Sequence, residues 1–322
     1  MRKSNSMKIS TTKILMMLLL VASSTIKSQD DLLSLVEEPE DKKPKKVYAT
    51  FKTLKIGNAQ TTETVKKKHL DYRISHRFGN VYDNTTKNPL NDAAQTGFGF
   101  DNASDIRNSL EYGILDNLSV GIGRSRLNRV VDGSLKWRFL TQTTNFKIPV
   151  SVAFFGSMGY THRPTSDIYA GVIKNFETKE AHRVSYVSQL IIASKLNNAI
   201  SLEILPTYVY RNFIKESVNP DNNSADVNGF ASIGFGGRIK VTKRVSIIGD
   251  YYYNLGSFYA NNPNIKNPLS FGAELETGGH VFSLFFTNAS GLIENTYLPF
   301  TTDSWSKGQV KFGFSISRTF AL

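Results

Sequence analysis

The sequence has no cysteine among its 322 residues, and beyond its N-terminal segment it has no long apolar run. Without cysteine there can be no disulfide bond, thiol nucleophile, cysteine-bound zinc or lipid-modified N-terminal cysteine. Hydrophobic residues make up 40% of the chain and its mean hydropathy is −0.26. No stretch reaches the roughly 20 apolar residues that a helix needs to cross a bilayer. A membrane protein built from helices is therefore excluded.

The sequence also lacks a recognisable catalytic or cofactor-binding motif. None of its five histidines lies in a nucleophile motif, and no helix is predicted after its glycine-rich stretches, as a phosphate-binding loop would require. The formal net charge is +12, but no basic helix with interleaved aromatic residues accompanies it. We therefore expect no catalytic residue, no cofactor, no metal and no nucleic-acid partner.

Three segments of different composition begin the chain. Basic residues precede the apolar run Ile14–Ala22 and small residues follow it, which predicts a secretory signal peptide over residues 1–28. Residues 29–46 begin acidic and end in lysines around Pro44, which predicts a disordered periplasmic linker. Residues 47–56 are weakly strand-like. They either pair with the main body, which we place within residues 47–322, or enter it as a plug.

The stretch Pro268–Asn288 shows the repeating unit of that main body. Its first half puts apolar side chains on one face, including Leu269 and Phe271, and polar or small ones on the other. Thr277–Gly279 then reverses the chain, because adjacent glycines tolerate the backbone angles of a tight hairpin. The return strand alternates again, which is the period of two that a β-strand imposes.

Short and long connections alternate along the chain from Lys68 onward. The short reversals are Asp116–Asn117, Gln142–Phe146, Asn197–Asn198, Thr242–Arg244 and Thr277–Gly279. The connections between them are Gly79–Ser104, Leu127–Val131, Tyr160–His182, Phe213–Asn228, Asn254–Asn267 and Ala289–Lys307, and all but Leu127–Val131 are long. Short turns therefore gather at one end of about twelve strands and long loops at the other. This layout predicts an all-β, antiparallel up-and-down transmembrane barrel of the bacterial outer membrane.

The two faces of the strands agree with a barrel. The outward candidates are Leu70, Tyr72, Ile74, Leu110, Tyr112, Leu118, Val120, Ile122, Leu135, Trp137, Phe139, Leu190, Ile192, Leu202, Ile204, Tyr208, Ile233, Phe235 and Ile239. A soluble sandwich would alternate too, but its outer face would be polar. Strands that often exceed nine residues are long enough to cross a bilayer.

Three features do not fit simple alternation. Pro206 removes a hydrogen-bond donor in mid-strand, which suggests a bulge. Asn108 lies on an apolar face, and the segments Ile148–Phe155 and Val245–Tyr253 are apolar on both faces. The last strand alternates well through Phe320 and resembles the C-terminal signal by which the barrel-assembly machinery recognises its substrates, so we expect that machinery to be a partner.

Several longer runs resemble an exported β-barrel family of Gram-negative bacteria whose function is unknown. They are DYRISHRFG from Asp71, FGFDNASDIRNSLEYGILDNLSVGIGRS from Phe98, LPTYVYRN from Leu205, DYYY from Asp250 and ETGGHVFSLFFTNASG from Glu276. The likeness extends from about Val47 to Phe320. It implies an outer-membrane barrel and brings no activity or catalytic residue with it.

The inward faces carry most of the charge. The basic residues are Arg73, Arg77, Arg107, Lys136, Arg138, Arg183, Arg211, Arg238, Lys240 and Lys311, and the acidic ones are Asp71, Asp105, Glu111, Glu203, Asp250, Glu274 and Glu276. Of these, we predict as lumen-lining Arg73, Arg77, Arg107, Glu111, Lys136, Arg138, Glu203, Arg211, Arg238, Asp250 and Glu274. Charges inside a barrel imply either a watery passage or a closed, mutually paired interior.

Two functions follow from these alternatives. The first is a narrow or gated channel for small solutes with a mild preference for anions, constricted by an inward-folding helix at Pro89–Gln95. The second is a sealed scaffold that presents its external loops to partners, and an outer-membrane hydrolase is a distant third.

Arg124 and Arg126 continue an outward face at the long-loop end of their strand. Because forked guanidinium groups suit phosphate, we predict that they contact lipopolysaccharide.

Overall fold

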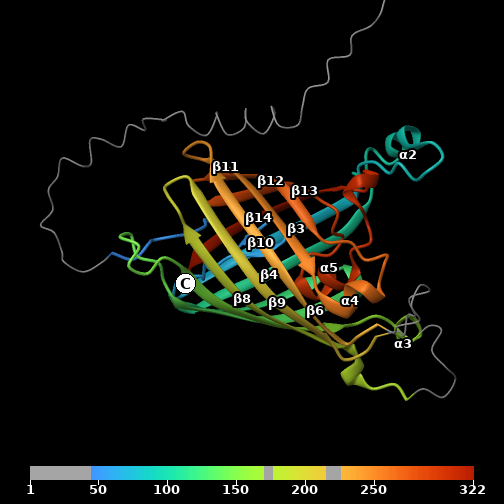
Figure 1. Ribbon diagram of the computed structural model, residues 1–322, viewed down its shortest axis with the longest axis horizontal. Coiled ribbons are helices and arrows are strands. Elements are labelled where there is room, and N and C mark those ends of the chain that lie inside the picture. Colours follow the sequence, from blue (N-terminus) through green and yellow to red (C-terminus); the bar gives the residue numbers. More distant parts are fainter. Residues whose placement is uncertain (1–44, 170–176, 215–225) are drawn as a thin grey trace, which may run out of the picture. The chain divides into compact units, whose positions relative to one another are not determined.

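The computed structural model describes residues 45–169, 177–214 and 226–322. Within these ranges twelve strands form a closed antiparallel barrel, and the last strand pairs with the first (Figure 1). The strands are β3 (His69–Asn80), β4 (Ala103–Leu115), β5 (Leu118–Ser125), β6 (Val130–Leu140), β7 (Ser151–Thr161), β8 (Val184–Lys195), β9 (Ile200–Arg211), β10 (Gly229–Lys240), β11 (Val245–Asn254), β12 (Leu269–Thr277), β13 (His280–Thr287) and β14 (Lys311–Ala321). The predicted fold class is confirmed. The predicted signal peptide and nearly all of the predicted linker lie outside the described residues.

The predicted turns join the strands that the sequence indicated. Asp116–Asn117 joins β4 to β5 and Thr277–Gly279 reaches from the end of β12 to the start of β13, both at the short-turn end. Ala321 pairs with His69, so β14 ends at the same end of the barrel at which β3 begins. The long connections lie at the opposite end, here called the long-loop end.

The outer wall is apolar, as predicted. Large exposed side chains cover it, among them Ile122, Trp137, Tyr208 and Phe271. A surface of this extent is expected to face lipid rather than water. Asn108 fits into this wall because its side-chain oxygen accepts a hydrogen bond of 2.9 Å from the hydroxyl of Tyr72.

The bulge predicted at Pro206 is wrong. β9 and β10 keep one register through the pair Pro206 and Ile233. On the β8 side, the pairs before and after Pro206 also share a register, so the missing N–H only interrupts the ladder. Register shifts occur instead in the pairs of β3 with β14 and β4, of β4 with β5 and of β6 with β7.

Short helices occupy the connections at the long-loop end. They are α2 (Pro89–Gln95), η1 (Leu127–Arg129), α3 (Thr165–Ile168), η2 (Glu180–Arg183), α4 (Gly256–Asn261), α5 (Glu294–Phe300) and η3 (Trp305–Lys307). Among the described residues, no helix is long and apolar enough to cross a membrane.

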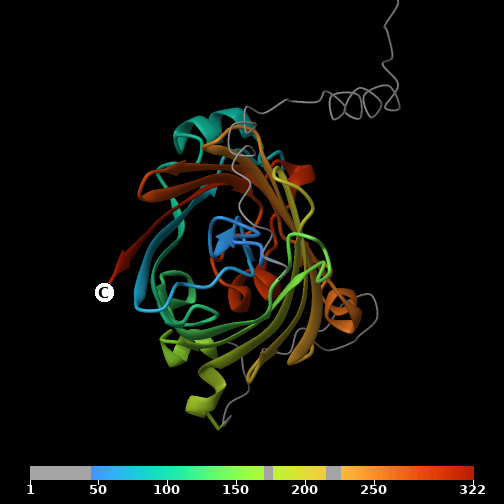
Figure 2. The same cartoon turned by 90° about the vertical axis from the view of Figure 1, so that its left-hand side faces the viewer.

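The prediction that Pro89–Gln95 folds inward is wrong, although a helix does form there. Figure 1 shows α2 beyond the ends of the strands, and Leu90 is 69% exposed. Its sequence PLNDAAQ offers one large apolar side chain, too few to bury the helix inside a lumen. The helix that does lie inside the barrel is α5 (Figure 2).

Candidate functional site

Residues 45–67 are here called the plug, and most of this segment between Thr50 and Val65 is buried inside the barrel (Figure 2). The plug enters at the short-turn end, where Lys46 forms a β-bridge with Thr143, and it leaves at the same end, where Lys67 forms a bridge with Gly113. In between, β1 (Lys55–Ile56) and β2 (Ala59–Gln60) form a hairpin. The buried plug residues are Thr50, Phe51, Thr53, Leu54, Ile56, Asn58, Ala59, Gln60, Thr61, Thr62 and Val65. The segment therefore occupies the lumen and adds no strand to the wall.

The tip of the plug hairpin is held by a network of buried polar groups. The backbone N–H of Asn58 donates to Oδ2 of Asp250 at 2.8 Å, and its side-chain Nδ2 donates to Oδ1 of Asp250 at 3.0 Å. The Asn58 Oδ1 accepts a hydrogen bond of 2.6 Å from Nη2 of Arg77. Ser270 donates to the same Asp250 carboxylate. The tip thus links β3 to β11 and β12 through one asparagine.

Gly57 permits this close approach. Its φ of +54° lies in the left-handed region that favours glycine. A Cβ at this position would collide with the side chains of Ser270 and Asp250. The hairpin tip therefore reaches the wall only because residue 57 has no side chain.

The plug residues just before the hairpin, Thr53 and Leu54, contact charged residues of the wall. Lys136 Nζ donates to the carbonyl of Leu54 at 3.0 Å, and the hydroxyl of Thr53 donates to Glu274 at 2.7 Å.

Nearer the entry, Arg138 lies 3.4 Å from Glu63. Burial raises the pKa of the Glu63 carboxyl despite the opposing effect of Arg138. Seating the plug therefore removes this carboxyl from water, and Arg138 offsets part of that cost.

The connection between β13 and β14 enters the lumen from the other end. Its residues 288–303, here called the α5 loop, include α5, in which Glu294 to Pro299 are all buried. Glu294 lies 3.5 Å from Lys55 and accepts a hydrogen bond of 3.3 Å from Gln60. The hydroxyl of Tyr297 donates to the carbonyl of Asn58 at 3.3 Å. The plug and the α5 loop therefore meet inside the barrel.

The two halves of the inner wall differ in chemistry. Strands β7 to β11 present many apolar side chains, namely Ala153, Phe155, Val187, Ile191, Leu205, Val209, Phe230, Ile248 and Tyr252. They form one cluster with Phe51, Ile56 and Ala59 of the plug and with Tyr297 and Leu298 of the α5 loop. Strands β12 to β14 and β3 to β6 present mainly polar groups, namely Asp71, Arg73, Ser75, Arg77, Asp105, Ser109, Asp132, Lys136, Ser270, Glu274, Ser283, Thr287 and Lys311. This asymmetry explains why Ile148–Phe155 and Val245–Tyr253 carry apolar residues on both faces.

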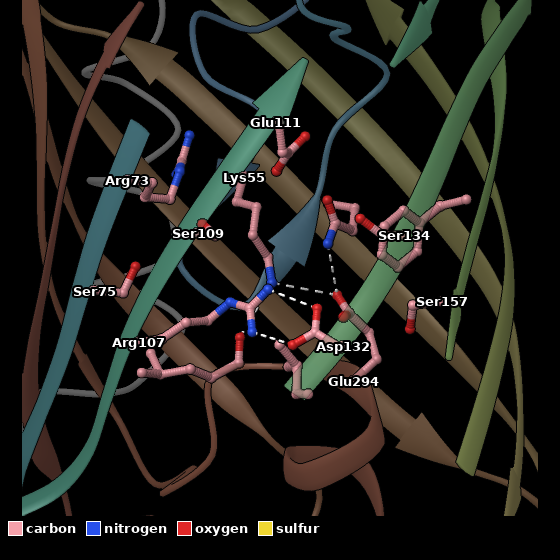
Figure 3. Close-up of a pocket in the computed structure, with 14 residues that line it drawn as sticks. Lys55, Arg73, Ser75, Arg107, Ser109, Glu111, Asp132, Ser134, Ser157 and Glu294 are labelled. Atoms are coloured by element: carbon pink, nitrogen blue, oxygen red, sulfur yellow. Dashed lines mark hydrogen bonds and ion pairs between the residues drawn. The ribbon is translucent and has the colours of Figure 1, made fainter. Parts of the chain in front are cut away.

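A cavity of about 30 Å³ remains between the plug and strands β3 to β7 (Figure 3). On its wall Arg107 and Asp132 form a two-point ion pair, with Nη2 2.7 Å from Oδ2. Arg73 also lines the cavity, and its Nε and Nη2 have no hydrogen-bond partner among the described residues. A cavity of this volume holds about one or two water molecules. This cavity therefore has no room for a larger solute in this state.

The eleven predicted lumen residues have different surroundings. Those that contact the plug are Arg77, Lys136, Arg138, Asp250 and Glu274. Those that line the small cavity are Arg73, Arg107 and Glu111.

The other three predicted lumen residues do not contact the plug through a hydrogen bond. Arg238 pairs with Glu274 at 3.2 Å. Arg211 pairs with Asp226 at the long-loop end, and Glu203 is buried without a hydrogen-bond partner among the described residues. Of the inward basic set, Lys240 is exposed, and Arg183 lies in η2 rather than in a strand.

Arg124 and Arg126 lie on the outer wall. Arg124 is in register with Asn108 and donates to the carbonyl of Ser125 at 2.6 Å, while Arg126 donates to the carbonyl of Ala103 at 2.5 Å. Both side chains are exposed.

The α5 loop is the part of the site that the sequence reasoning missed. Its length and its position between two strands are those of an external loop. Leu292, Ile293, Tyr297 and Leu298 are all buried. This apolar content was the signal that could have identified it, because a solvated loop rarely carries so many large apolar side chains.

A family comparison agrees with this architecture. Residues 51–320 match the model of a family described as a membrane-bound β-barrel domain (DUF5777). Among solved structures, the NanC porin is 9% identical with a TM-score of 0.44, and the match covers 79% of this chain and 100% of that one. The KdgM porin is 8% identical with a TM-score of 0.42, over 78% and 99% of the two chains. Acinetobacter baumannii outer membrane protein Omp33 is 9% identical with a TM-score of 0.38, over 81% and 100%. No curated protein matches the sequence.

Proposed function

The chain belongs to the family of membrane-bound β-barrel domains, and from that premise we propose that it is a gated conduit for small solutes across the outer membrane. In the closed state the plug and the α5 loop fill the lumen from opposite ends. In the open state the plug is displaced toward the short-turn end, and solutes pass along the charged half of the wall.

One observation carries this proposal. The plug contacts the charged half of the wall through hydrogen bonds and ion pairs, such as those of Asn58 with Arg77 and of Leu54 with Lys136. Water can replace such contacts, so each contributes a net of about 1.5–3 kcal/mol to keeping the plug seated, the range for hydrogen bonds to charged groups. Displacement would also hydrate the small cavity that already separates the plug from strands β3 to β7.

The plug and the α5 loop contact each other inside the barrel, so this contact lies across the proposed path. Lys55 donates to the carbonyl of Leu292 at 3.2 Å and lies 3.5 Å from the Glu294 carboxylate. The Lys55 side chain is only 14% exposed, so the pair is screened little by salt. We propose that separation of Lys55 from Glu294 is a necessary step of opening.

We propose a mild preference for anions in the open state. Removing the plug would leave the Arg77 guanidinium without Asn58 and Lys136 without the Leu54 carbonyl. Arg73 already has two N–H groups without hydrogen-bond partners among the described residues, although its Nε lies 4.0 Å from Asp71. The preference would be mild, because Arg107 stays paired with Asp132 and Arg238 with Glu274.

A sealed scaffold is the second candidate, and a different observation favours it. Phe51, Ile56 and Ala59 of the plug are almost fully buried in the apolar cluster. Burying a large apolar side chain contributes about 1.5–3 kcal/mol, so Phe51 and Ile56 oppose displacement of the plug. If the free energy of this apolar burial exceeds what opening can supply, the barrel stays closed and acts through its external loops.

Two contacts with the cell envelope are also proposed. Arg124 and Arg126 would bind the phosphates of lipopolysaccharide, because both are exposed on the lipid-facing wall near the long-loop end. The barrel-assembly machinery would recognise β14, whose outward residues include Phe312, Phe314 and Phe320.

Conductance of the purified protein in planar bilayers tests the conduit. We expect the wild type to be mostly closed and a variant lacking residues 48–66 to conduct steadily. Deletion of α2, which lies outside the barrel, is the matched control and should behave as the wild type does. If the plug deletion folds as a barrel and stays electrically silent, the sealed scaffold replaces the conduit.

A further inference from the structure

A second and larger cavity, of about 320 Å³, lies at the long-loop end of the barrel. It is separate from the small cavity beside the plug, with which it shares no lining residue. Residues from the ends of β6 to β9 form its sides, and Asn295, Thr296 and Phe300 of α5 also line it. Its volume is at the lower end of the range of about 300–1,000 Å³ that is usual for small-molecule sites. Below, it is called the mouth pocket.

The charge balance of the mouth pocket favours an anion. Arg163 is one of its lining residues and is partly exposed, and its guanidinium makes no hydrogen bond or ion pair with the described residues. The Arg211 side chain is 9% exposed, and its Nε has no hydrogen-bond partner among the described residues. Buried cationic N–H groups without an acceptor are costly, and a bound carboxylate would supply one.

Two acidic residues among those described line the mouth pocket, of which Asp167 is exposed to solvent and Asp226 is already saturated with hydrogen bonds. Asp226 accepts hydrogen bonds from Nη2 of Arg211 at 3.2 Å, from Nδ2 of Asn262 at 2.9 Å and from its neighbour Val227 at 2.7 Å. It therefore does not offer a free carboxylate to a cation. The Arg211 guanidinium also lies against a stacked pair of rings, 5.7 Å from the centre of Phe230 and 5.2 Å from that of Phe258.

The remaining walls of the mouth pocket are largely apolar. Val130, Ile168, Val184 and Phe300 contribute side chains to it. A fully hydrated inorganic ion would gain nothing from these walls, whereas the hydrocarbon part of an organic anion would bury apolar surface against them. The pocket thus combines guanidinium groups with a surface for an apolar body.

The helix that lines the mouth pocket also contacts the plug. Asn295 accepts a hydrogen bond from Ser157 and donates one to Ser185, both at 3.0 Å, which fixes α5 to the wall. The residues on either side of Asn295 and Thr296 are Glu294 and Tyr297, which contact Lys55 and Asn58 of the plug. A ligand that shifts α5 would therefore act on the contact that closes the barrel.

We infer that the mouth pocket binds a small organic anion, a carboxylate on an apolar body of about one ring, and that this is the outer recognition site of the conduit. The second part rests on the proposed function. The first part does not, because binding can be measured on a closed barrel.

Isothermal titration of the full-length protein in detergent tests the site, with benzoate as the probe. We expect benzoate to bind and neutral benzamide to bind at least tenfold more weakly. Arg163→Gln should weaken benzoate binding by at least tenfold, whereas Arg244→Gln, at the opposite end of the barrel, should leave it unchanged. Circular dichroism and heat-modified gel mobility would show that both variants are folded.

Three results would overturn the assignment. They are equal binding of benzoate and benzamide, equal binding of inorganic phosphate and benzoate, and benzoate binding that is unaffected by Arg163→Gln. Failure of the conduit would appear separately, as a silent plug deletion in a protein that still binds benzoate.

Discussion

Asn58 and Asp250 form a two-point contact deep in the lumen, with the backbone N–H and side-chain amide of Asn58 donating to the two oxygens of one carboxylate at 2.8 and 3.0 Å. Asp250 is on the wall and Asn58 is at the tip of the plug. Asp250 is 3% exposed and Asn58 is 1% exposed, so both residues are almost fully buried. This contact ties the position of the plug to a small number of side chains, so single substitutions can test it.

Gly57→Ala should release the tip of the plug. The substitution forces alanine into the left-handed region, at a cost of about 1–2 kcal/mol, and places a Cβ against Ser270 and Asp250. Hydrogen exchange of residues 50–65 should quicken at least tenfold while the barrel strands keep their protection. Gly278→Ala is the control, because a Cβ there meets no atom within 4 Å. Equal exchange in the two variants would contradict the role of Gly57.

Asn58→Ala should unseat the plug by a different route. It leaves the Arg77 Nη2 and one oxygen of Asp250 buried without their partner, at about 1–3 kcal/mol for each group. Limited proteolysis should then cut the plug at a protease concentration that spares it in the wild type. Asn145→Ala, in the exposed β6–β7 turn, should behave as the wild type does. A plug that stays protected in Asn58→Ala would show that its apolar contacts hold it without the tip.

Much of the barrel could be predicted because a bilayer imposes a simple rule on each strand. Ile122 and Trp137 face outward and Arg73 and Lys136 face inward because alternate side chains point to opposite faces. The inner contents could not be predicted in this way. The α5 loop and the plug fold against strands far away in sequence, and nothing in the spacing of Glu294 indicates that it meets Lys55.

Apart from residues 47–56, for which a plug was one of two alternatives, the apolar strand faces were the indication of those contents. Phe155 and Tyr252 interrupt the expected polar lumen because they pack against the plug and the α5 loop. In a barrel filled with water, these inward positions would be expected to carry polar side chains. The outcome at Pro206 has a different cause, since one missing N–H can be tolerated in a ladder whose register is fixed on both sides.

Lys55→Glu should favour opening. The substitution replaces the attraction between Lys55 and Glu294 by repulsion between two carboxylates, in a site that is almost inaccessible to water. Open probability in planar bilayers should rise at least several-fold. Lys52→Glu reverses a charge in the exposed pair with Glu276, which contributes about 0–1 kcal/mol, and should change gating little. If both variants gate alike, the Lys55 and Glu294 contact is not the gate.

The proposed anion preference can be measured once the plug is removed. In the variant lacking residues 48–66, Arg107→Glu together with Arg138→Glu should shift the reversal potential in a salt gradient toward cations. Both side chains line the lumen. Lys87→Glu, in an exposed external loop, is the control. An unchanged reversal potential would mean that the permeating ions do not pass this wall.

Replacing Arg124 and Arg126 by alanine should reduce the lipopolysaccharide that co-purifies with the protein. Two forked guanidinium groups on the exposed wall would lose their charge-assisted contacts with phosphate. Arg244→Ala, at the short-turn end, should leave the lipid content unchanged. Equal lipid content in the double variant and the wild type would reject this contact.

The most direct measurement follows the plug while current is recorded. Because the chain has no cysteine, Thr62→Cys supplies a single thiol at a plug position that is fully buried. We expect a water-soluble maleimide to leave this thiol unmodified while the barrel is closed, and to modify it at a rate that rises with open probability, as when Lys55→Glu is added. Lys87→Cys, exposed in both states, should react at one rate throughout. If current flows while the Thr62→Cys thiol stays protected, the proposal that displacement of the plug opens the conduit is contradicted.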